Sequence, residues 1–193
     1  MLKPQCALFK IVLPGDIRKI KAESNNAVSG GGARDIRFSH ARFEPVVARM
    51  FPTIVHGRKT KRKHLAVRVG QLKYVQHGQQ QLRDIEYWPP TNARGSEGRI
   101  TRVPEIPPLQ ASCFPQNEGA VFYLFIQGPD GTLTAHFVSE RSLGVKGRWD
   151  KWVAETMLTA LREAPGNVSA RGWLDWSTGE RYMTVRTPEK KRP

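Results

Sequence analysis

The sequence has only two cysteines, Cys6 and Cys113, and they lie far apart in a chain of 193 residues. A disulfide framework or a zinc site needs more cysteines at closer spacing. We therefore expect free thiols in a reducing cytoplasm, and no metal. Long apolar runs and basic amphipathic helices are also missing, which excludes both a membrane-spanning and a membrane-surface role. Lys10, Pro14 and Asp16 interrupt the apolar N-terminal stretch, so it does not resemble a signal peptide.

Acidic residues are scarce. The chain has 17 Asp and Glu against 31 Lys and Arg, which gives a formal net charge of +14 and a pI near 10.3. Such a balance points to a polyanionic partner, most often nucleic acid. The hydrophobic content of 39% and charged content of 25% are typical of a globular chain long enough for one core. We expect a single domain over 1–186 and a charged, disordered tail over 187–193.

The motifs of several enzyme classes are missing too. There is no HExxH, no Gly-rich phosphate loop with Lys-Ser/Thr, no Ser-His-Asp arrangement and no carboxylate pair followed by x-Lys. The five histidines are scattered along the chain. We therefore assign no catalytic residue and no cofactor. The alternative is a compact metal-dependent nuclease whose carboxylates follow no pattern that we recognise.

Short β signals dominate what is present, and they predict a mainly-β chain with two or more helices. The helical spacing of apolar residues predicts helices over 43–51 and 149–164, the latter with its tryptophans in the core. A Gly-rich loop is expected over 25–34. The expected strands are 7–13, 16–22, 34–39, 64–77, 83–88 and 98–103, with a hairpin over 120–139 around the turn GPDG. Short strands with two helices favour a closed or nearly closed barrel with helices at its openings.

Two segments combine arginine with a carboxylate, asparagine and serine. The first is the Gly-rich loop with its flanks (19–37), and the second is PPTNARGSEGRITRV (89–103). In the major groove, arginine donates two bonds to guanine, asparagine pairs with adenine, and a carboxylate accepts from the cytosine amino group. A surface meant only for phosphates would gain nothing from Glu97, which the DNA backbone repels. The opposing interpretation is that Glu97 forms a salt bridge with an arginine and only stiffens its loop.

These segments resemble part of a known family. The stretch IKAESNNAVSGGGARDIRFSHARFEPVVARMFP (20–52) is similar to the start of the N-terminal effector domain of EcoRII-type restriction endonucleases. EYWPPTNARGSEGRITRV (86–103), PLQ (108–110) and NEGAVFYLF (117–125) are similar to the second half of that domain. The resemblance is discontinuous over about 7–175. At the glycines, Ala33–Arg34–Asp35 replaces a different trio of the family.

The resemblance implies a DNA-binding pseudobarrel, the fold of plant B-three transcription-factor domains, with a seven-stranded open barrel and helices at its openings. It also implies two arms that grip the major groove, an N-arm over about 19–37 and a C-arm over about 89–102. It further implies a bacterial restriction-modification, phage-defence role. The relatives carry a C-terminal nuclease domain for which this chain has no room, so a separate nuclease domain or subunit is an expected partner beside double-stranded DNA.

Together these observations predict sequence-specific binding of duplex DNA, with bases giving specificity and phosphates giving position. A nucleic-acid-binding protein without sequence preference is a further alternative. The basic run HGRKTKRKH (56–64) alone indicates only a solvated loop. The predicted base contacts are Arg34, Asp35, Arg37, Asn92, Arg94, Ser96, Glu97 and Arg99. The predicted phosphate contacts are Lys19, Lys21, Ser24, Asn25, Arg58, Lys59, Lys61, Arg62, Lys63 and Arg102.

Overall fold

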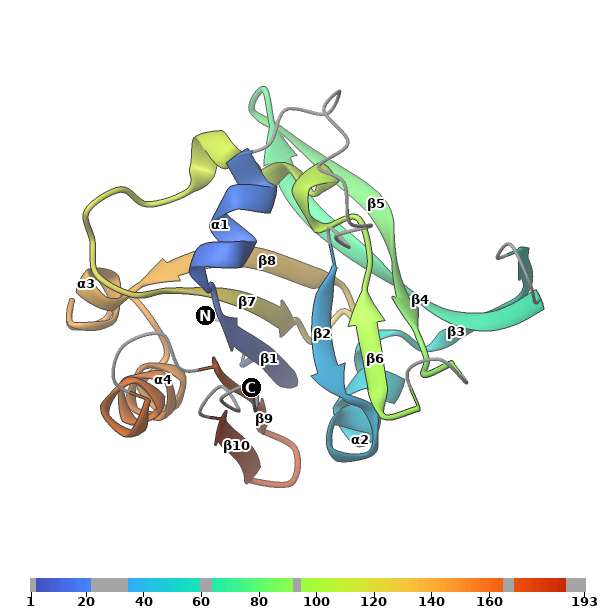
Figure 1. The fold of residues 1–193 in the computed structure, drawn as a ribbon. Helices are drawn as coiled ribbons and strands as arrows, with labels where there is room; N and C mark the ends of the chain where they lie inside the picture. The colour runs from blue at the N-terminus through green and yellow to red at the C-terminus, as the bar shows by residue number, and fades with distance from the viewer. Residues whose placement is uncertain (1–2, 22–34, 60–63, 92–94, 165–168, 187–193) are drawn as a thin grey trace, which may run out of the picture.

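The computed structural model describes residues 3–21, 35–59, 64–91, 95–164 and 169–186, and in them strands predominate (Figure 1). The strands are β1 (Cys6–Ile11), β2 (Ile36–Ser39), β3 (Thr53–Lys59), β4 (His64–Gln76), β5 (Gln79–Trp88), β6 (Glu97–Ile100), β7 (Val121–Gln127), β8 (Leu133–Ser139), β9 (Ser169–Asp175) and β10 (Glu180–Arg186). The helices are α1 (Pro14–Lys21), α2 (His40–Met50), α3 (Glu140–Leu143) and α4 (Lys151–Glu163). Three short 3₁₀ helices lie between β6 and β7: η1 (Val103–Glu105), η2 (Pro107–Leu109) and η3 (Ala111–Cys113).

All ten strands belong to one curled, open sheet that forms a half-barrel (Figure 1). The strand order is β10-β9-β1-β7-β8-β4-β5-β6-β2, and β3 pairs with β4 off this path. Most neighbours are antiparallel, but β4 and β8 are parallel and share a single residue pair, Leu72 and Leu133. The expected mainly-β architecture with helices is confirmed, with ten strands in the described residues where seven were expected.

The core lies on both faces of the sheet. Every residue of β1 is buried, because alternate side chains enter different apolar clusters. Leu8 points into the half-barrel, which α2 fills with Phe43 and Met50. Phe9 points to the opposite face, where α4 packs. The curvature of the sheet and helix α2 together fix the position of β2, which runs directly into α2.

Most of the expected elements are confirmed. The structure contains α2 with its apolar face buried, α4, the β7–β8 hairpin and strands β1, β2, β4 and β5. Trp149 and Trp152 pack against the cluster beneath α4, as expected of core residues. Both cysteines are free, and burial raises the pKa of the Cys6 thiol to about 11. No helix within the described ranges is long and apolar enough to cross a membrane.

The strand predicted over 16–22 is wrong, because this segment is helix α1. Pro14 suits the first helical turn. The Asp16 side chain then reaches back to accept a hydrogen bond from the Leu13 backbone N–H at 3.1 Å, and the Leu13 carbonyl accepts from the N–H of Ile17. These contacts satisfy the start of a helix.

Three further expectations differ from the structure. Thr53–Lys59, which includes the start of the basic run expected as a solvated loop, is strand β3 and pairs with β4. The strand expected over 98–103 ends at Ile100, and Val103 begins a 3₁₀ helix although its side chain is buried. The C-terminal hairpin β9–β10 was not among the expected elements. The loop expected over 25–34 and the tail over 187–193 lie outside the described residues.

Candidate nucleic-acid interface

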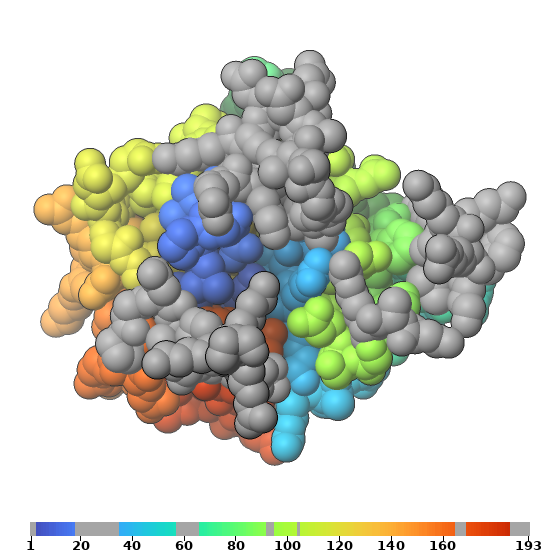
Figure 2. All heavy atoms as spheres, in the orientation of Figure 1, coloured from blue at the N-terminus to red at the C-terminus, as the bar shows by residue number. Residues whose placement is uncertain are grey.

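Strands β2 and β6, which come from the two predicted DNA-binding segments, are antiparallel neighbours. The register places Arg37 opposite Arg99, and Ser39 opposite Glu97. Ile36, Phe38, Gly98 and Ile100 face the core, so the polar residues between them share the other face. We call Asp35, Arg37, Glu97 and Arg99 the arginine strip. In Figure 2, β2 and β6 lie side by side on one face of the molecule.

Two ion pairs cross the strip diagonally. Arg37 Nη1 lies 3.6 Å from Glu97 Oε2, and Arg99 Nη1 donates to Asp35 Oδ2 at 3.2 Å. The Glu97 side chain is 40% exposed and that of Asp35 is 11% exposed. Each arginine thus pairs with a carboxylate from the other strand. The formal charges of the four side chains sum to zero, in a chain whose net charge is +14.

Trp88 supports one of these arginines from the third strand. It pairs with Arg99 in the β5–β6 register, and the Arg99 guanidinium carbon lies 5.5 Å from the centre of the Trp88 ring. The indole N–H in turn donates to Glu86 Oε2 at 2.9 Å. A guanidinium above an indole face is attracted by the ring quadrupole. Arg99 is therefore held by the Trp88 ring and by the Asp35 carboxylate. The role of Trp88 was not predicted from the sequence, although this residue directly precedes the Pro-Pro of the second segment.

Close packing beneath the strip depends on small and polar groups. Gly98 leaves room for the ring of Tyr87, which a Cβ at this position would overlap. The Tyr87 hydroxyl lies 3.0 Å from His40 Nδ1, and burial raises the pKa of this phenol. The backbone N–H of His40 donates to the Ser96 carbonyl at 2.9 Å. These contacts tie the start of α2 to the residues that lead into β6.

The two predicted arms join the strip at opposite ends. The segment 22–34 leads into β2 at Ile36, which pairs with Ile100 at the far end of β6. The segment 92–94 leads through Gly95 and Ser96 into β6 at Glu97, which pairs with Ser39. The arginine strip is therefore the part of the sheet that lies between the attachment points of both arms.

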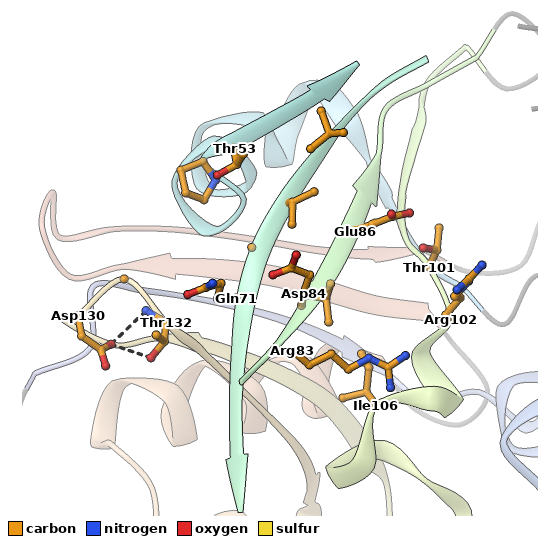
Figure 3. Close-up of a pocket in the computed structure, with 16 residues that line it drawn as sticks. Thr53, Gln71, Arg83, Asp84, Glu86, Thr101, Arg102, Ile106, Asp130 and Thr132 are labelled. Atoms are coloured by element: carbon orange, nitrogen blue, oxygen red, sulfur yellow. Dashed lines mark hydrogen bonds between the residues drawn. The ribbon is translucent and has the colours of Figure 1, made fainter. Parts of the chain in front are cut away.

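A cavity of about 620 Å³ adjoins the strip on its β5 side. Figure 3 shows Glu86, Thr101 and Arg102 along one side of it, and Asp130 and Thr132 at the other end. Arg102 is exposed and has a left-handed backbone (φ 55°), and it projects from the turn that follows β6. Arg83 lines the cavity but is engaged, because it donates to the Glu105 carbonyl at 2.5 Å. Glu86, which accepts from the Trp88 indole, is part of the cavity wall, so the cavity lies beside the residues that support Arg99.

The structure brings together four of the predicted base contacts, which are the members of the arginine strip. Ser96 is exposed beside them, and the predicted phosphate contact Arg102 lies past the end of β6. Lys19 and Lys21 belong to α1, and Arg58 and Lys59 to β3, but their side chains are outside the description. The remaining predicted residues also lie outside the described ranges: Ser24, Asn25, Arg34, Lys61, Arg62, Lys63, Asn92 and Arg94.

Comparisons with protein-family models, with curated proteins and with solved structures found no match for this chain. Among the described residues, no group of three or more His, Cys, Asp or Glu side chains is placed to hold a metal ion. The functional assignment therefore rests on the sequence and on the geometry of the strip.

Proposed function

We propose that this protein binds double-stranded DNA sequence-specifically, with the arginine strip facing base edges in the major groove. The observation that carries this proposal is the register of β2 and β6. Two segments about sixty residues apart, both with the residue types that read base edges, form neighbouring strands with Arg37 opposite Arg99. A chance distribution of charge over a basic surface gives no reason for this alignment.

The charge of the strip favours contact with bases over contact with phosphates. Phosphate contacts need positive charge, and the chain has a large excess of it. The strip has no net positive charge, because each arginine is paired with a carboxylate. A neutral surface rich in donors and acceptors suits base edges, which present both kinds of group.

The shape of the strip is also suitable. β2 is the last strand in the sheet order, so one side of the β2–β6 ribbon has no neighbouring strand on this path. Two strands lie about 4.8 Å apart, and the major groove is about 12 Å wide and admits a two-stranded ribbon.

The curled half-barrel with helices supports the finer fold proposal, a B-three-like pseudobarrel of the kind found in EcoRII-type effector domains. In that case the protein is the recognition module of a bacterial restriction-modification system. It would work in the cytoplasm and direct a nuclease domain or subunit to its site.

The test compares two arginine variants on a site selected from a pool of random duplexes. Arg99→Ala should weaken binding to the selected site by about 1–3 kcal/mol, because a bidentate contact to guanine is lost. Binding to random duplex should change much less. Arg162→Ala removes the same charge from the exposed surface of α4 and serves as the matched control, with no expected change in preference.

Urea unfolding of both variants establishes that each is folded before binding is compared. Equal losses on selected and random duplex would assign Arg99 to phosphate contact and contradict base reading. Failure to enrich any duplex from the pool would contradict sequence-specific binding itself.

A further inference from the structure

The arginine strip repeats one short pattern on its two strands. Asp35-Ile36-Arg37 and Glu97-Gly98-Arg99 both have a carboxylate, a core-facing residue and an arginine in this order. The strands are antiparallel, and the two arginines are directly opposite each other. The pattern is therefore related to itself by a half-turn about an axis that passes between Arg37 and Arg99, perpendicular to the sheet.

The ion pairs, like the sequence pattern, obey this half-turn. The operation exchanges the Arg37–Glu97 pair with the Arg99–Asp35 pair, and both pairs are present, at 3.6 Å and 3.2 Å. The symmetry is approximate, because Asp35 is more buried than Glu97 and only Arg99 lies against an indole ring. It nevertheless places two equivalent pairs of charges on one face of the sheet in a single chain.

Each ion pair matches the major-groove edge of one G·C base pair. Guanine presents two acceptors, N7 and O6, and the paired cytosine presents the N4 amino donor. An arginine and an adjacent carboxylate supply the complementary donors and acceptor. An A·T pair also presents two acceptors and one donor, but the donor lies between the acceptors and a thymine methyl group follows them, an order that the strip does not match.

Duplex DNA has two-fold axes perpendicular to its own axis, and a protein with two-fold symmetry reads a site with the same symmetry. This rule is usually applied to dimers, but the half-turn here relates two strands of one chain. When the β2–β6 ribbon faces the groove, the two-fold axis between Arg37 and Arg99 coincides with a two-fold axis of the duplex. Opposite residues of the two strands lie about 4.5–5.5 Å apart, and adjacent base pairs about 3.4 Å. A long arginine side chain spans this difference, so the two arginines face base pairs on the two sides of that axis.

We infer that the centre of the target is a self-complementary step of two G·C pairs, 5′-CG-3′ or 5′-GC-3′, read by one copy of the chain. This inference rests on the proposed function, which it sharpens from duplex DNA to a class of site. The guanines lie on opposite DNA strands, one for each arginine. Cytosine N4 groups then face Glu97 and Asp35.

The experiment uses the full chain and the site that it selects from random duplex, with only the central step changed. Duplexes with 5′-CG-3′ and 5′-GC-3′ at the centre are compared with 5′-GG-3′ and 5′-AT-3′. The 5′-GG-3′ duplex is the matched control, because it has two G·C pairs but both guanines are on one strand. We expect one of the self-complementary G·C steps to bind at least about tenfold more tightly than both controls, the cost of one lost bidentate contact.

Alanine variants show which half of the strip reads each base pair of the central step. Arg37→Ala and Arg99→Ala should each relax discrimination at one base pair, and the two pairs should be exchanged by the DNA two-fold axis. Methylation of cytosine at N4 removes a donor hydrogen, so it should weaken the wild type. Glu97→Ala should be insensitive to this methyl group on one of the two cytosines and sensitive on the other.

Tight, specific binding to an asymmetric centre, or both arginine variants relaxing the same base pair, would overturn this inference and leave sequence-specific binding intact. Equal binding of 5′-GG-3′ and the better self-complementary step would also overturn it. Absence of any selected duplex would overturn the proposed function together with it.

Discussion

Gly98 lies where β6 passes over Tyr87, and it is the residue at which the strip is most sensitive to added volume. A Cβ at this position would overlap the Tyr87 hydroxyl and ring. Gly98→Ala should lower the free energy of unfolding by about 1–3 kcal/mol, the usual cost of overpacking. Urea unfolding measures this change. Gly95→Ala is the control, because nothing lies within 4 Å of its added Cβ, and it should be nearly neutral.

The Tyr87 hydroxyl is the atom nearest to that added Cβ, so removing it should relieve part of the strain. The double variant Gly98→Ala/Tyr87→Phe should therefore be less destabilised than the sum of the two single changes, the sign of direct coupling. Additive losses, or a Gly98→Ala variant as stable as Gly95→Ala, would show that β6 and Tyr87 are not packed as described.

At the scale of elements, the β7–β8 turn lies beside the contact between β4 and β8. These two strands share a single residue pair, the fewest of any two neighbours in the described sheet. Asp130 in this turn accepts from Lys73 of β4 at 2.6 Å and from the Thr132 side chain at 2.8 Å. The hydrogen bond from Lys73, then those from Thr132, lower the pKa of Asp130 from 3.8 to about 2. A carboxyl whose pKa falls on folding stabilises the fold above its unfolded pKa, and this contribution is lost as pH falls through the folded value.

We therefore expect Asp130→Asn to lower the urea midpoint at pH 7, with a difference from wild type that shrinks between pH 4 and pH 2. Asp84→Asn, an exposed change on β5, is the matched control at each pH. A difference that stayed constant down to pH 2 would show that the ionised Asp130 does not clamp this turn to β4.

How far elements could be predicted from the sequence depended on how local their signals were. α4 and the β7–β8 hairpin carry an apolar period and a turn motif within their own residues. The strand expected at α1 was wrong because Ile17 and Ile20 are three residues apart, a spacing that fits a helix and not a strand. The deciding contact is from Asp16 to the preceding backbone. Strand β3 was not predicted because its second half belongs to the basic run 56–64, and its pairing partner, β4, lies outside the segment itself.

The candidate site divides in the same way. The residue types of the strip were predictable from the sequence. Arg37, Glu97 and Arg99 lie in segments that combine arginine with a carboxylate and are too short to bury these charges. Their register was not, since it depends on Ile36, Phe38 and Ile100 entering the core in step. The support of Arg99 by Trp88 requires a third strand, and no spacing within one segment reveals it.

At the scale of the whole molecule, the excess of positive charge sets the salt dependence of binding. The logarithm of the DNA association constant should fall linearly with the logarithm of salt concentration, because condensed counterions are released. Replacing Lys59, Lys61 and Lys63 together by alanine should weaken all duplexes about equally and make this slope shallower by roughly 3. Fluorescence anisotropy titrations over a range of salt concentrations measure both quantities.

The control for this prediction is the triple alanine variant of Lys146, Arg148 and Lys151. It removes the same charge from exposed positions at the start of α4, which lies across the molecule from β3 (Figure 1). It should leave the slope nearly unchanged. A triple variant at 59–63 that altered which sequence is preferred would show that these lysines contact bases.

The position of β1 between β9 and β7 has a consequence for the order in which the protein can be made. One side of this strand pairs with β7, and the other with β9, which begins only at Ser169. During synthesis at about 5–20 residues per second, β1 waits roughly 10–30 s for its last partner. Until then an almost wholly apolar strand presents an open hydrogen-bonding side, the feature that recruits strands from other chains. A nascent chain of this protein is therefore most exposed to aggregation just before its final hairpin leaves the ribosome.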